Sequence, residues 1–313
     1  MSNSSQSSQS VGLIGCSLAG NAITERLVRA GMRVYSHDLS LCPVHSVVRL
    51  GAITLDSPAA VAAATPRVIL TTSGRQDAET ILWGQHGLLH GPRKPTTIID
   101  LDTIQPAEFA DIAKRASTSG VELIDAAISG TYKVIGHGEA GLVVGGAALA
   151  VNACGDIFNV LAPRWKHVGG AGSAASARVM LAVLIQLQRS ALAEALVHAE
   201  SLGINMAAFS DLVRASPAYS AATDAKSQQM VRREYTGADR IDADLRDAAT
   251  LRKRALEAGQ LLPTVEAHSE LLAEVVARGE GHFDVAMLIE SVRRRRPNTA
   301  ASTASSTESP DAS

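Results

Sequence analysis

Residues 11–38 read VGLIGCSLAGNAITERLVRAGMRVYSHD: a short apolar run, a glycine turn, a helical stretch and a second apolar run that ends in an acid. Strand, turn, helix, strand and acid in this order predict a β-α-β unit with a dinucleotide fingerprint. In such a unit Gly15 lets the chain turn sharply out of the first strand, and Gly20 lets the helix pack close to the sheet. The free N–H groups at the start of the helix then face a pyrophosphate.

Ser17 stands where the G-x-G-x-x-G pattern has its middle glycine. Because serine carries only a small side chain, we expect the backbone to approach the phosphates still, with a hydroxyl added to the site. The predicted contacts with the cofactor in this turn are Gly15, Ser17, Leu18, Ala19 and Gly20. The alternative is a loop and helix junction whose glycines serve packing only, and the order of the elements favours nucleotide binding.

Asp38 ends the second predicted strand, about 20 residues beyond the turn, where a carboxylate accepts hydrogen bonds from the adenosine ribose hydroxyls. A 2′-phosphate at this place would meet like charge, and Leu39 and Ser40 follow where an arginine would be needed to receive it. The sequence therefore predicts NAD as the cofactor, with NADP disfavoured.

Composition limits the class of protein. The 313 residues are enough for two domains, and 46% hydrophobic with only 3% aromatic residues indicates a core of Ala, Val, Leu and Ile. A net charge of −2 argues against nucleic acid or an anionic membrane as a partner. Cys16, Cys42 and Cys154 are too scattered for a disulfide framework or a metal site, which favours a reducing cytoplasm. We expect neither a signal peptide nor a membrane span.

The chain alternates short β-like runs with helical stretches in its first half and turns helical in its second. Beyond the opening unit, strands are predicted at 67–72, 96–101, 122–126 and 142–144, with a helix at 105–119. Such alternation is typical of a mainly parallel sheet covered on both faces. Later helices are predicted at 173–203, 205–215, 241–258, 263–278 and 283–295.

Four segments follow from this pattern. We predict polar low-complexity tails at 1–10 and 297–313, a Rossmann-type NAD-binding domain at 11–170, and an all-helical domain for substrate binding and dimerisation at 171–296. A long helix joins the two domains.

Two features of the helical half concern partners. The run 173–203 is apolar around more of its circumference than one core face needs, which predicts a homodimer or homotetramer. Four arginines at 293–296 end the last helix, and we interpret them as complementing the helix dipole rather than as a patch for nucleic acid or lipid.

Three further stretches carry a resemblance to a known family: IDLDTIQP at 99–106, DAAISG at 125–130 with LVVGG at 142–146, and GGAG at 169–172 before the long helix. Their order and spacing, with LRD at 245–247, resemble the β-hydroxyacid dehydrogenase family, which includes 3-hydroxyisobutyrate and tartronate-semialdehyde dehydrogenases. The resemblance covers about residues 11–295. It implies hydride transfer between a nicotinamide and a small hydroxy acid or related carbonyl compound.

The resemblance also implies roles for individual residues. Thr103 would lie beside the nicotinamide, and Ser129, Gly130 and Thr131 would bind the substrate's carboxylate. A Ser-Gly pair just beyond a strand, at the edge of the sheet where α/β proteins bind ligands, agrees with an anion cradle, although an ordinary turn explains the same residues.

The chain departs from the family where catalysis needs a proton. Arg178 stands in place of the acid–base lysine, six residues after the second glycine of G-x-x-G, and Arg246 in place of a second lysine beside the cofactor. Leu181 and Ala182 stand where the family has a substrate-orienting asparagine. With a pKa above about 12, an arginine polarises a carbonyl but is a poor proton donor and a worse base.

The sequence therefore leaves open which group moves the proton. Candidates are Tyr132, Lys133, His137 and Tyr219. We expect an oxidoreductase in which Arg178 polarises the substrate, because both replacements keep the positive charge. The alternatives are a catalytically weakened homologue that acts as a nucleotide-binding or regulatory protein, and an imine reductase-like enzyme.

Overall fold

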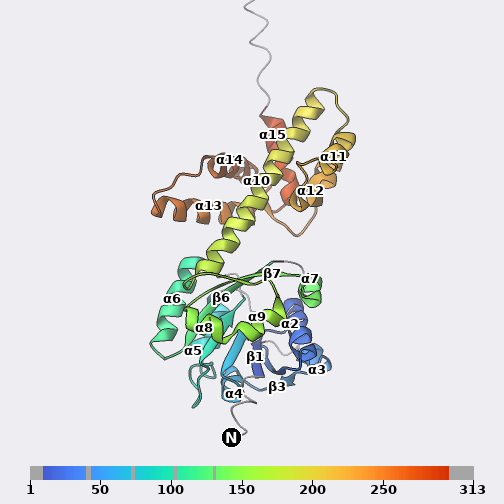
Figure 1. Cartoon of the computed structure of the whole chain (residues 1–313). Coiled ribbons are helices and arrows are strands. Elements are labelled where there is room, and N and C mark those ends of the chain that lie inside the picture. Colours follow the sequence, from blue (N-terminus) through green and yellow to red (C-terminus); the bar gives the residue numbers. More distant parts are fainter. Residues whose placement is uncertain (1–9, 40–43, 72–74, 102–103, 130–131, 296–313) are drawn as a thin grey trace, which may run out of the picture. The chain divides into compact units, whose positions relative to one another are not determined.

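The structure is a computed structural model, shown in Figure 1. It describes residues 10–39, 44–71, 75–101, 104–129 and 132–295. The chain forms two compact units, Met1–Arg178 and Val179–Ser313.

The first unit is built on one eight-stranded sheet in the order β3-β2-β1-β4-β5-β6-β7-β8. Its strands are β1 (Ser10–Ile14), β2 (Arg33–His37), β3 (Ile53–Thr54), β4 (Arg67–Leu70), β5 (Thr97–Asp100), β6 (Glu122–Ser129), β7 (Gly141–Gly145) and β8 (Lys166–Gly169). All neighbouring strands are parallel except β6 and β7, which pair antiparallel. The mainly parallel sheet is therefore confirmed, and β3 and β8 are additions to the predicted strands.

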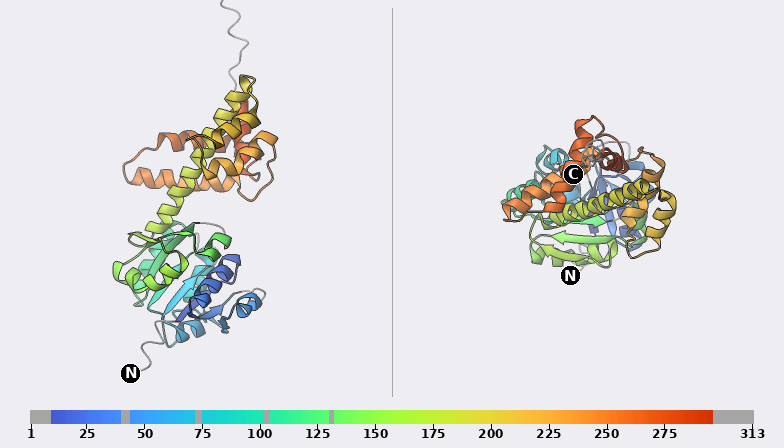
Figure 2. Two further views of the ribbon diagram at one scale, coloured as in Figure 1. Left: turned by 45° about the vertical axis from the view of Figure 1, so that its right-hand side comes forward. Right: turned by 90° about the horizontal axis from the view of Figure 1, so that it is seen from above.

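Helices cover both faces of this sheet, as Figure 2 shows. One face packs against α2 (Leu18–Arg29), α7 (Tyr132–His137), α8 (Ala148–Ala153) and α9 (Gly155–Leu161), and the other against α4 (Pro58–Ala64), α5 (Arg75–Trp83) and α6 (Pro106–Ser117). A further helix, α3 (Val44–Arg49), lies beside α2. Side chains alternate between the two layers: Val68 and Leu70 of β4 face the second layer, whereas Ile69 faces the first. Buried on both faces, the strands read as continuous aliphatic runs.

The second unit is helical, as expected. Its helices are α10 (Ser173–Ser201), which begins in the first unit, α11 (Met206–Arg214), α12 (Ala221–Arg232), α13 (Ile241–Glu257), α14 (Pro263–Ala277), a 3-10 turn η1 (Val285–Met287) and α15 (Leu288–Arg294). The sequence analysis missed α12, whose residues are mostly polar. A capping box between Ser220 and Thr223 starts this helix.

The long helix α10 is the central core helix of the second unit. Val179 and Val183 pack against Ala248 and Val265, and a later segment around Leu196 packs with residues of α12 and α15. Among the described residues α10 is also the one helix long and apolar enough to cross a membrane, with 39% of its most apolar window buried in the fold. The core helix of a folded domain meets the same criterion, so this finding by itself assigns no membrane span.

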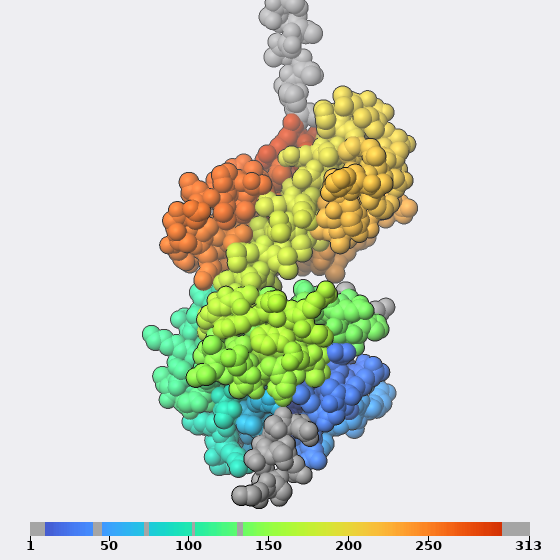
Figure 3. All heavy atoms as spheres, in the orientation of Figure 1, coloured from blue at the N-terminus to red at the C-terminus, as the bar shows by residue number. Residues whose placement is uncertain are grey.

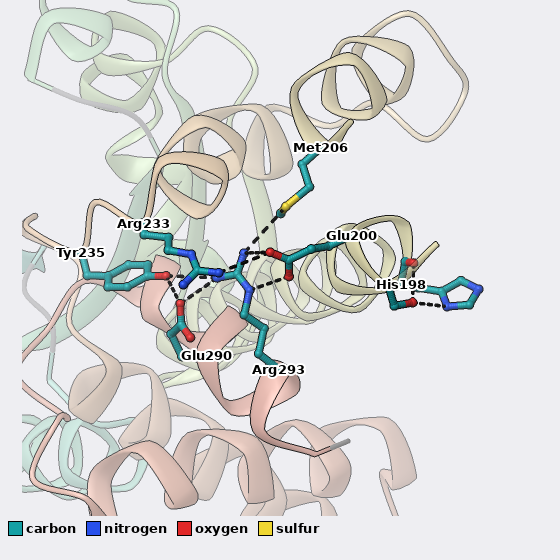
Figure 4. A network of polar contacts seen from close by, with 8 residues as sticks. His198, Glu200, Met206, Arg233, Tyr235, Glu290 and Arg293 are labelled. Carbon is teal, nitrogen blue, oxygen red and sulfur yellow. Dashed lines mark hydrogen bonds and ion pairs between the residues drawn. The ribbon is translucent and has the colours of Figure 1, made fainter. Parts of the chain in front are cut away.

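Arg293, Arg294 and Arg295 at the end of α15 form ion pairs within the second unit, and Arg296 lies outside the described residues. Figure 4 shows Arg293 between Glu200 and Glu290, with Nε 2.9 Å from Glu200 Oε2 and Nη1 2.7 Å from Glu290 Oε1. Arg294 pairs with Glu280 and Arg295 with Glu274. Burial and the hydrogen bond to Glu290 raise the pKa of Tyr235 in the same network. These ion pairs give the described arginines a structural role. That role depends mainly on specific acidic partners and not on the helix dipole alone.

Candidate functional site

The turn after β1 requires its first glycine. Gly15 has φ +106°, and a Cβ atom there would lie 2.6 Å from the carbonyl oxygen of Thr71 and 2.7 Å from its Oγ1. The hydroxyl of Thr71 donates to Gly15 O at 2.8 Å, and Gly15 N donates to His37 O at 3.0 Å. The turn is thus held between β2 and β4, at the carboxyl edge of the sheet, where α/β proteins bind ligands.

Gly20 serves the packing role expected of it. A Cβ atom on Gly20 would come within 2.2 Å of the carbonyl oxygen of Gly15, so only glycine lets α2 start directly against the turn. Ser17, by contrast, has φ −63° and ψ −179°, which any residue adopts. Its Oγ accepts a hydrogen bond from Gly20 N at 3.3 Å, so the added hydroxyl is the N-cap of α2. The strand, turn and helix of the fingerprint are therefore kept with Ser17 in place of the middle glycine.

Asp38 lies where the fingerprint predicts. Its Oδ2 accepts a hydrogen bond from Cys16 N at 2.5 Å, which joins the end of β2 to the turn after β1. The Cys16 side chain is buried beside it. Burial, together with the charge of Asp38 and a hydrogen bond to it, raises the pKa of the thiol to about 12. A carboxylate and a glycine turn therefore meet at the edge of the sheet, as an adenosine ribose and a pyrophosphate require.

The end of β6 carries the predicted substrate residue Ser129. Its side chain is exposed, and its Oγ donates to Gly141 O at 3.3 Å across the antiparallel pair with β7. Gly130, Thr131 and Thr103 lie outside the described residues, so their predicted roles are carried forward as predictions.

Asp125 is a residue of this region whose role the sequence analysis did not assign. It is 3% exposed, and its two oxygens accept hydrogen bonds from Gly172 N and Ala175 N, each at 2.8 Å. Burial raises the pKa of Asp125, and the hydrogen bonds from Ala175 and Gly172 oppose that shift. A Cβ atom on Gly145 would lie 2.5 Å from Asp125 Oδ1, so this glycine makes room for the contact. The carboxylate thus occupies the start of α10.

Arg178 and Arg246, the two arginines that the sequence analysis singled out, differ in environment. Arg178 is partly buried on α10, and its Nε is buried with no hydrogen-bond partner among the described residues. Arg246 is largely exposed on α13, with Nη1 3.7 Å from Asp242 Oδ2. Arg178 is the last residue of the first compact unit, whereas Arg246 belongs to the second.

The candidates for proton transfer are only partly described. His137 is exposed at the end of α7, and Tyr219 is exposed between α11 and α12. The side chains of Tyr132 and Lys133 lie outside the description. Among the described residues, no group of three or more His, Cys, Asp or Glu side chains is placed to hold a metal ion.

A cavity of about 530 Å³ is lined by residues of α2, α3 and α7. Its lining includes Leu18, Glu25 and Arg29 of α2, Arg49 of α3 and His137 of α7. Leu18 is the one predicted cofactor residue in its lining. We therefore do not assign this cavity as the pyrophosphate site.

Comparison with known proteins places this geometry in a family. The model of the NAD binding domain of 6-phosphogluconate dehydrogenase matches residues 10–169, and a model described as NAD-binding of NADP-dependent 3-hydroxyisobutyrate dehydrogenase matches residues 170–292. The chain is 25% identical over 281 residues to 2-(hydroxymethyl)glutarate dehydrogenase of Eubacterium barkeri, covering 90% of this chain and 93% of that one. It is 23% identical to 2-hydroxy-3-oxopropionate reductase of Escherichia coli, covering 90% and 96%.

A solved structure agrees with the fold. The 3-hydroxyisobutyrate dehydrogenase of Mycobacterium tuberculosis superposes with a TM-score of 0.76 at 20% identity, over 91% of this chain and 99% of that one.

Fold, turn and matches together define an NAD(P)-dependent oxidoreductase. The chain belongs to the β-hydroxyacid dehydrogenase family and is of the 3-hydroxyisobutyrate dehydrogenase-like type. The resemblance drawn from the sequence motifs is thereby confirmed at the level of the family.

Proposed function

We propose that this protein is an NAD-preferring dehydrogenase or reductase of a small hydroxy acid or a related carbonyl compound, with an atypical acid–base group. The observation that carries the cofactor assignment is the contact between Asp38 and the turn, which sets a carboxylate beside a cradle that only Gly15 and Gly20 allow. When bound, the nicotinamide would accept or supply the hydride.

The preference for NAD rests on charge. Asp38 repels a 2′-phosphate and accepts from ribose hydroxyls, and the residue that follows it is Leu39. One family model is described as NADP-dependent, so the choice of nucleotide is a proposal for this chain. Calorimetric titration tests it, and NADP bound as tightly as NAD would refute it.

We assign substrate binding to Ser129, with Gly130 and Thr131. Ser129 supports this assignment because it ends a strand at the ligand-binding edge and has an exposed hydroxyl. The two curated relatives are, by name, enzymes of small acids that carry a hydroxyl. A carboxylate on the substrate matches a site of hydroxyl and backbone N–H donors.

Arg178 is proposed as the group that polarises the substrate's carbonyl or hydroxyl oxygen. The Nε of Arg178 is buried with no hydrogen-bond partner among the described residues, which supports a role for this guanidinium beyond the fold. In the oxidation the hydroxyl carbon loses a hydride and its oxygen loses a proton, and Arg178 cannot take that proton at neutral pH. We assign that step to one of Tyr132, Lys133, His137 and Tyr219, and we place Arg246 beside the cofactor.

A variant series at Arg178 separates the enzyme from a weakened homologue. The Arg178→Ala variant should lose most activity. The Arg178→Lys variant should keep or raise turnover of a hydroxy acid, and its rate should show an additional pH dependence where the lysine titrates. The activity screen for these variants tests NAD and NADP, each in combination with hydroxy acids, aldehydes and cyclic imines. NAD binding without turnover of any substrate would favour a regulatory nucleotide-binding protein, and turnover of imines alone would favour an imine reductase-like enzyme.

We also propose that the protein is a homodimer or homotetramer. In the second unit, α10 exposes Met180, Leu181 and Leu184 at 51%, 48% and 53%, although it is the core helix there. Figure 3 shows α10 side chains at the surface between those of α11–α12 and α13–α14. A monomeric mass in light scattering at micromolar concentration would contradict this.

A further inference from the structure

We propose that Asp125 is a positioning residue: it holds the start of α10 against β6 and thereby fixes where Arg178, one turn further along the helix, places its guanidinium. This inference rests on the proposed function, in which Arg178 polarises the substrate's oxygen. It gives a buried carboxylate a role in the reaction without contact between that carboxylate and the substrate.

Asp125 lies level with the ligand-binding edge of the sheet. Its register partner on β5 is Asp100, the last residue of that strand. The carboxyl ends of parallel strands form the edge at which α/β proteins bind ligands. Ser129, the proposed substrate residue, ends the same strand β6 four residues further on. The start of α10 is therefore attached to the strand that carries Ser129.

Two peptide N–H groups make this attachment. Gly172 N donates to Asp125 Oδ1 and Ala175 N donates to Asp125 Oδ2, each at 2.8 Å. The first N–H groups of a helix have no partner within the helix, and an acidic group there also complements the helix dipole. One donor precedes α10 and the other lies in its first turn, so the two bonds fix the rotation of this turn as well as its distance from β6.

Two glycines make the close approach possible. A Cβ atom on Gly145 of β7 would lie 2.5 Å from Asp125 Oδ1 and 3.0 Å from Ala174 N. Gly172 has φ +87°, and a Cβ atom there would lie 2.9 Å from the carbonyl oxygen of Pro106 at the start of α6. The start of α10 is thus packed against β7 and α6 with no space for a side chain at either glycine.

Arg178 lies on the face of α10 that this contact fixes. Helix residues three and four apart are neighbours, so Arg178 lies one turn beyond Ala174 and Ala175, which are 0% and 8% exposed. The Nε of Arg178 is buried with no hydrogen-bond partner among the described residues. The backbone that carries Arg178 therefore decides where this side chain lies, and Asp125 holds that backbone.

Kinetics of the full-length variants test the inference, with NAD and the best substrate of the activity screen. Asp125→Asn replaces one of the two acceptor oxygens by a donor, whereas Gly145→Ala keeps the carboxylate and places a Cβ atom against it. We expect each to lower kcat by about tenfold to a hundredfold, because a misplacement of about 1 Å at a reacting group can cost that much. Calorimetric affinity for NAD should change by less than about twofold, because the glycine turn and Asp38 are untouched.

Gly170→Ala is the matched control. It lies in the segment that leads into α10, and a Cβ atom there would meet nothing within 4 Å. This variant should keep kcat within about twofold of the parent chain. A loss for Gly170→Ala as large as for Gly145→Ala would show that the segment tolerates no change, and would overturn the specific role of Asp125.

A double-mutant cycle with Arg178→Ala separates positioning from a general loss of structure. In the Arg178→Ala background, Asp125→Asn should lower kcat little further, because no guanidinium is left to misplace. An unchanged kcat for Asp125→Asn, or equal losses with and without Arg178, would overturn the inference and leave the proposed function intact. Full activity of Arg178→Ala itself would refute the proposed role of Arg178, and this inference with it.

Discussion

Among the described residues, each unit contains a buried carboxylate that accepts from peptide N–H groups at the start of a helical segment, Asp125 in the first and Asp284 in the second. Asp125 of the first unit is 3% exposed and accepts from Gly172 N and Ala175 N at the start of α10. Asp284 of the second unit is 1% exposed, caps η1 by accepting from Ala286 N at 3.0 Å, and lies 2.8 Å from Lys226 Nζ.

The difference shows two ways to keep a charge inside a protein. Asp125 is surrounded by peptide N–H groups, which are fixed by the backbone and do not titrate. Asp284 accepts from one peptide N–H and pairs with a single buried ammonium, that of Lys226, which also lies 3.1 Å from Asp239 Oδ2. Removing Lys226 would leave a buried charge, whereas no single side chain neutralises Asp125. The second unit should therefore be the more sensitive to loss of one residue.

The largest effect is expected at Lys226. Lys226→Met should destabilise the protein by about 3–5 kcal/mol, because it leaves the buried charge of Asp284 without its partner. Urea unfolding measures the change. Lys253→Met, an exposed lysine of α13, is the matched control and should change stability by less than about 0.5 kcal/mol.

A double variant sharpens this expectation. Lys226→Met with Asp284→Asn removes the unpaired charge and should recover part of the lost stability, since the asparagine oxygen can still accept from Ala286 N. If the double variant were no more stable than Lys226→Met, the cost would come from lost packing rather than from the charge.

The next effect is expected at Asp125. Asp125→Asn keeps one acceptor but turns an NH₂ group toward a backbone N–H, so it should cost about 2 kcal/mol. Glu122→Gln, an exposed position on the same strand, is the control. Calorimetric unfolding measures both. A loss as large as that of Lys226→Met would contradict the distinction between peptide and side-chain neutralisation.

Local sequence spacing explains which features of the two units could be predicted. The turn from Gly15 to Gly20 and the acid at Asp38 follow from local spacing, and they lie as expected. The two-residue strand β3 has no periodicity to detect, and the polar helix α12 has little amphipathicity, so neither was predicted. Each unit therefore contains elements that the sequence did not predict, β3 and β8 in the first and α12 in the second.

Contacts between residues that are far apart in the chain could not be predicted from the sequence. Asp125 meets residues 47 and 50 positions away, and Lys226 meets Asp284 58 positions away. Patterns of hydrophobicity give the elements but not which polar side chains come together between them.

The third effect is a pH dependence that arises from Asp244 in the second unit. Burial raises the pKa of Asp244 to about 7; Arg189 opposes the shift, and Asp247, Asp239 and Asp284 add to it. The Arg189 Nη1 is 3.9 Å from Asp244 Oδ2 and is too distant to offset burial.

A raised pKa in the folded state stabilises the protein below the unfolded pKa, near 4, and this stability is lost as the pH rises through 7. Asp244→Asn should therefore be more stable than the parent chain at pH 8, by on the order of 2 kcal/mol, with the advantage shrinking toward pH 4. Urea unfolding at several pH values measures it. An advantage that is independent of pH would show that Asp244 is ionised throughout.

The smallest effect has the opposite sign and comes from His268. Its side chain is buried on α14, with Nδ1 2.7 Å from Ser190 Oγ and Nε2 3.2 Å from Gln186 Oε1. Burial lowers its pKa from 6.5 to about 4. Between these values the unfolded chain binds a proton that the folded chain does not, so stability is present above pH 6.5 and is lost as the pH falls toward 4.

His268→Gln tests this, because glutamine keeps a polar group for Ser190 and Gln186 but does not titrate. At pH 7.5 the variant should differ from the parent chain only by its repacking cost, whereas between pH 6.5 and 5 the parent should lose about 1 kcal/mol more than the variant. His282→Gln, an exposed histidine in the same unit, controls for general histidine protonation. Parallel stability curves for the parent and the His268 variant would mean that His268 takes up its proton equally in the folded and unfolded chains.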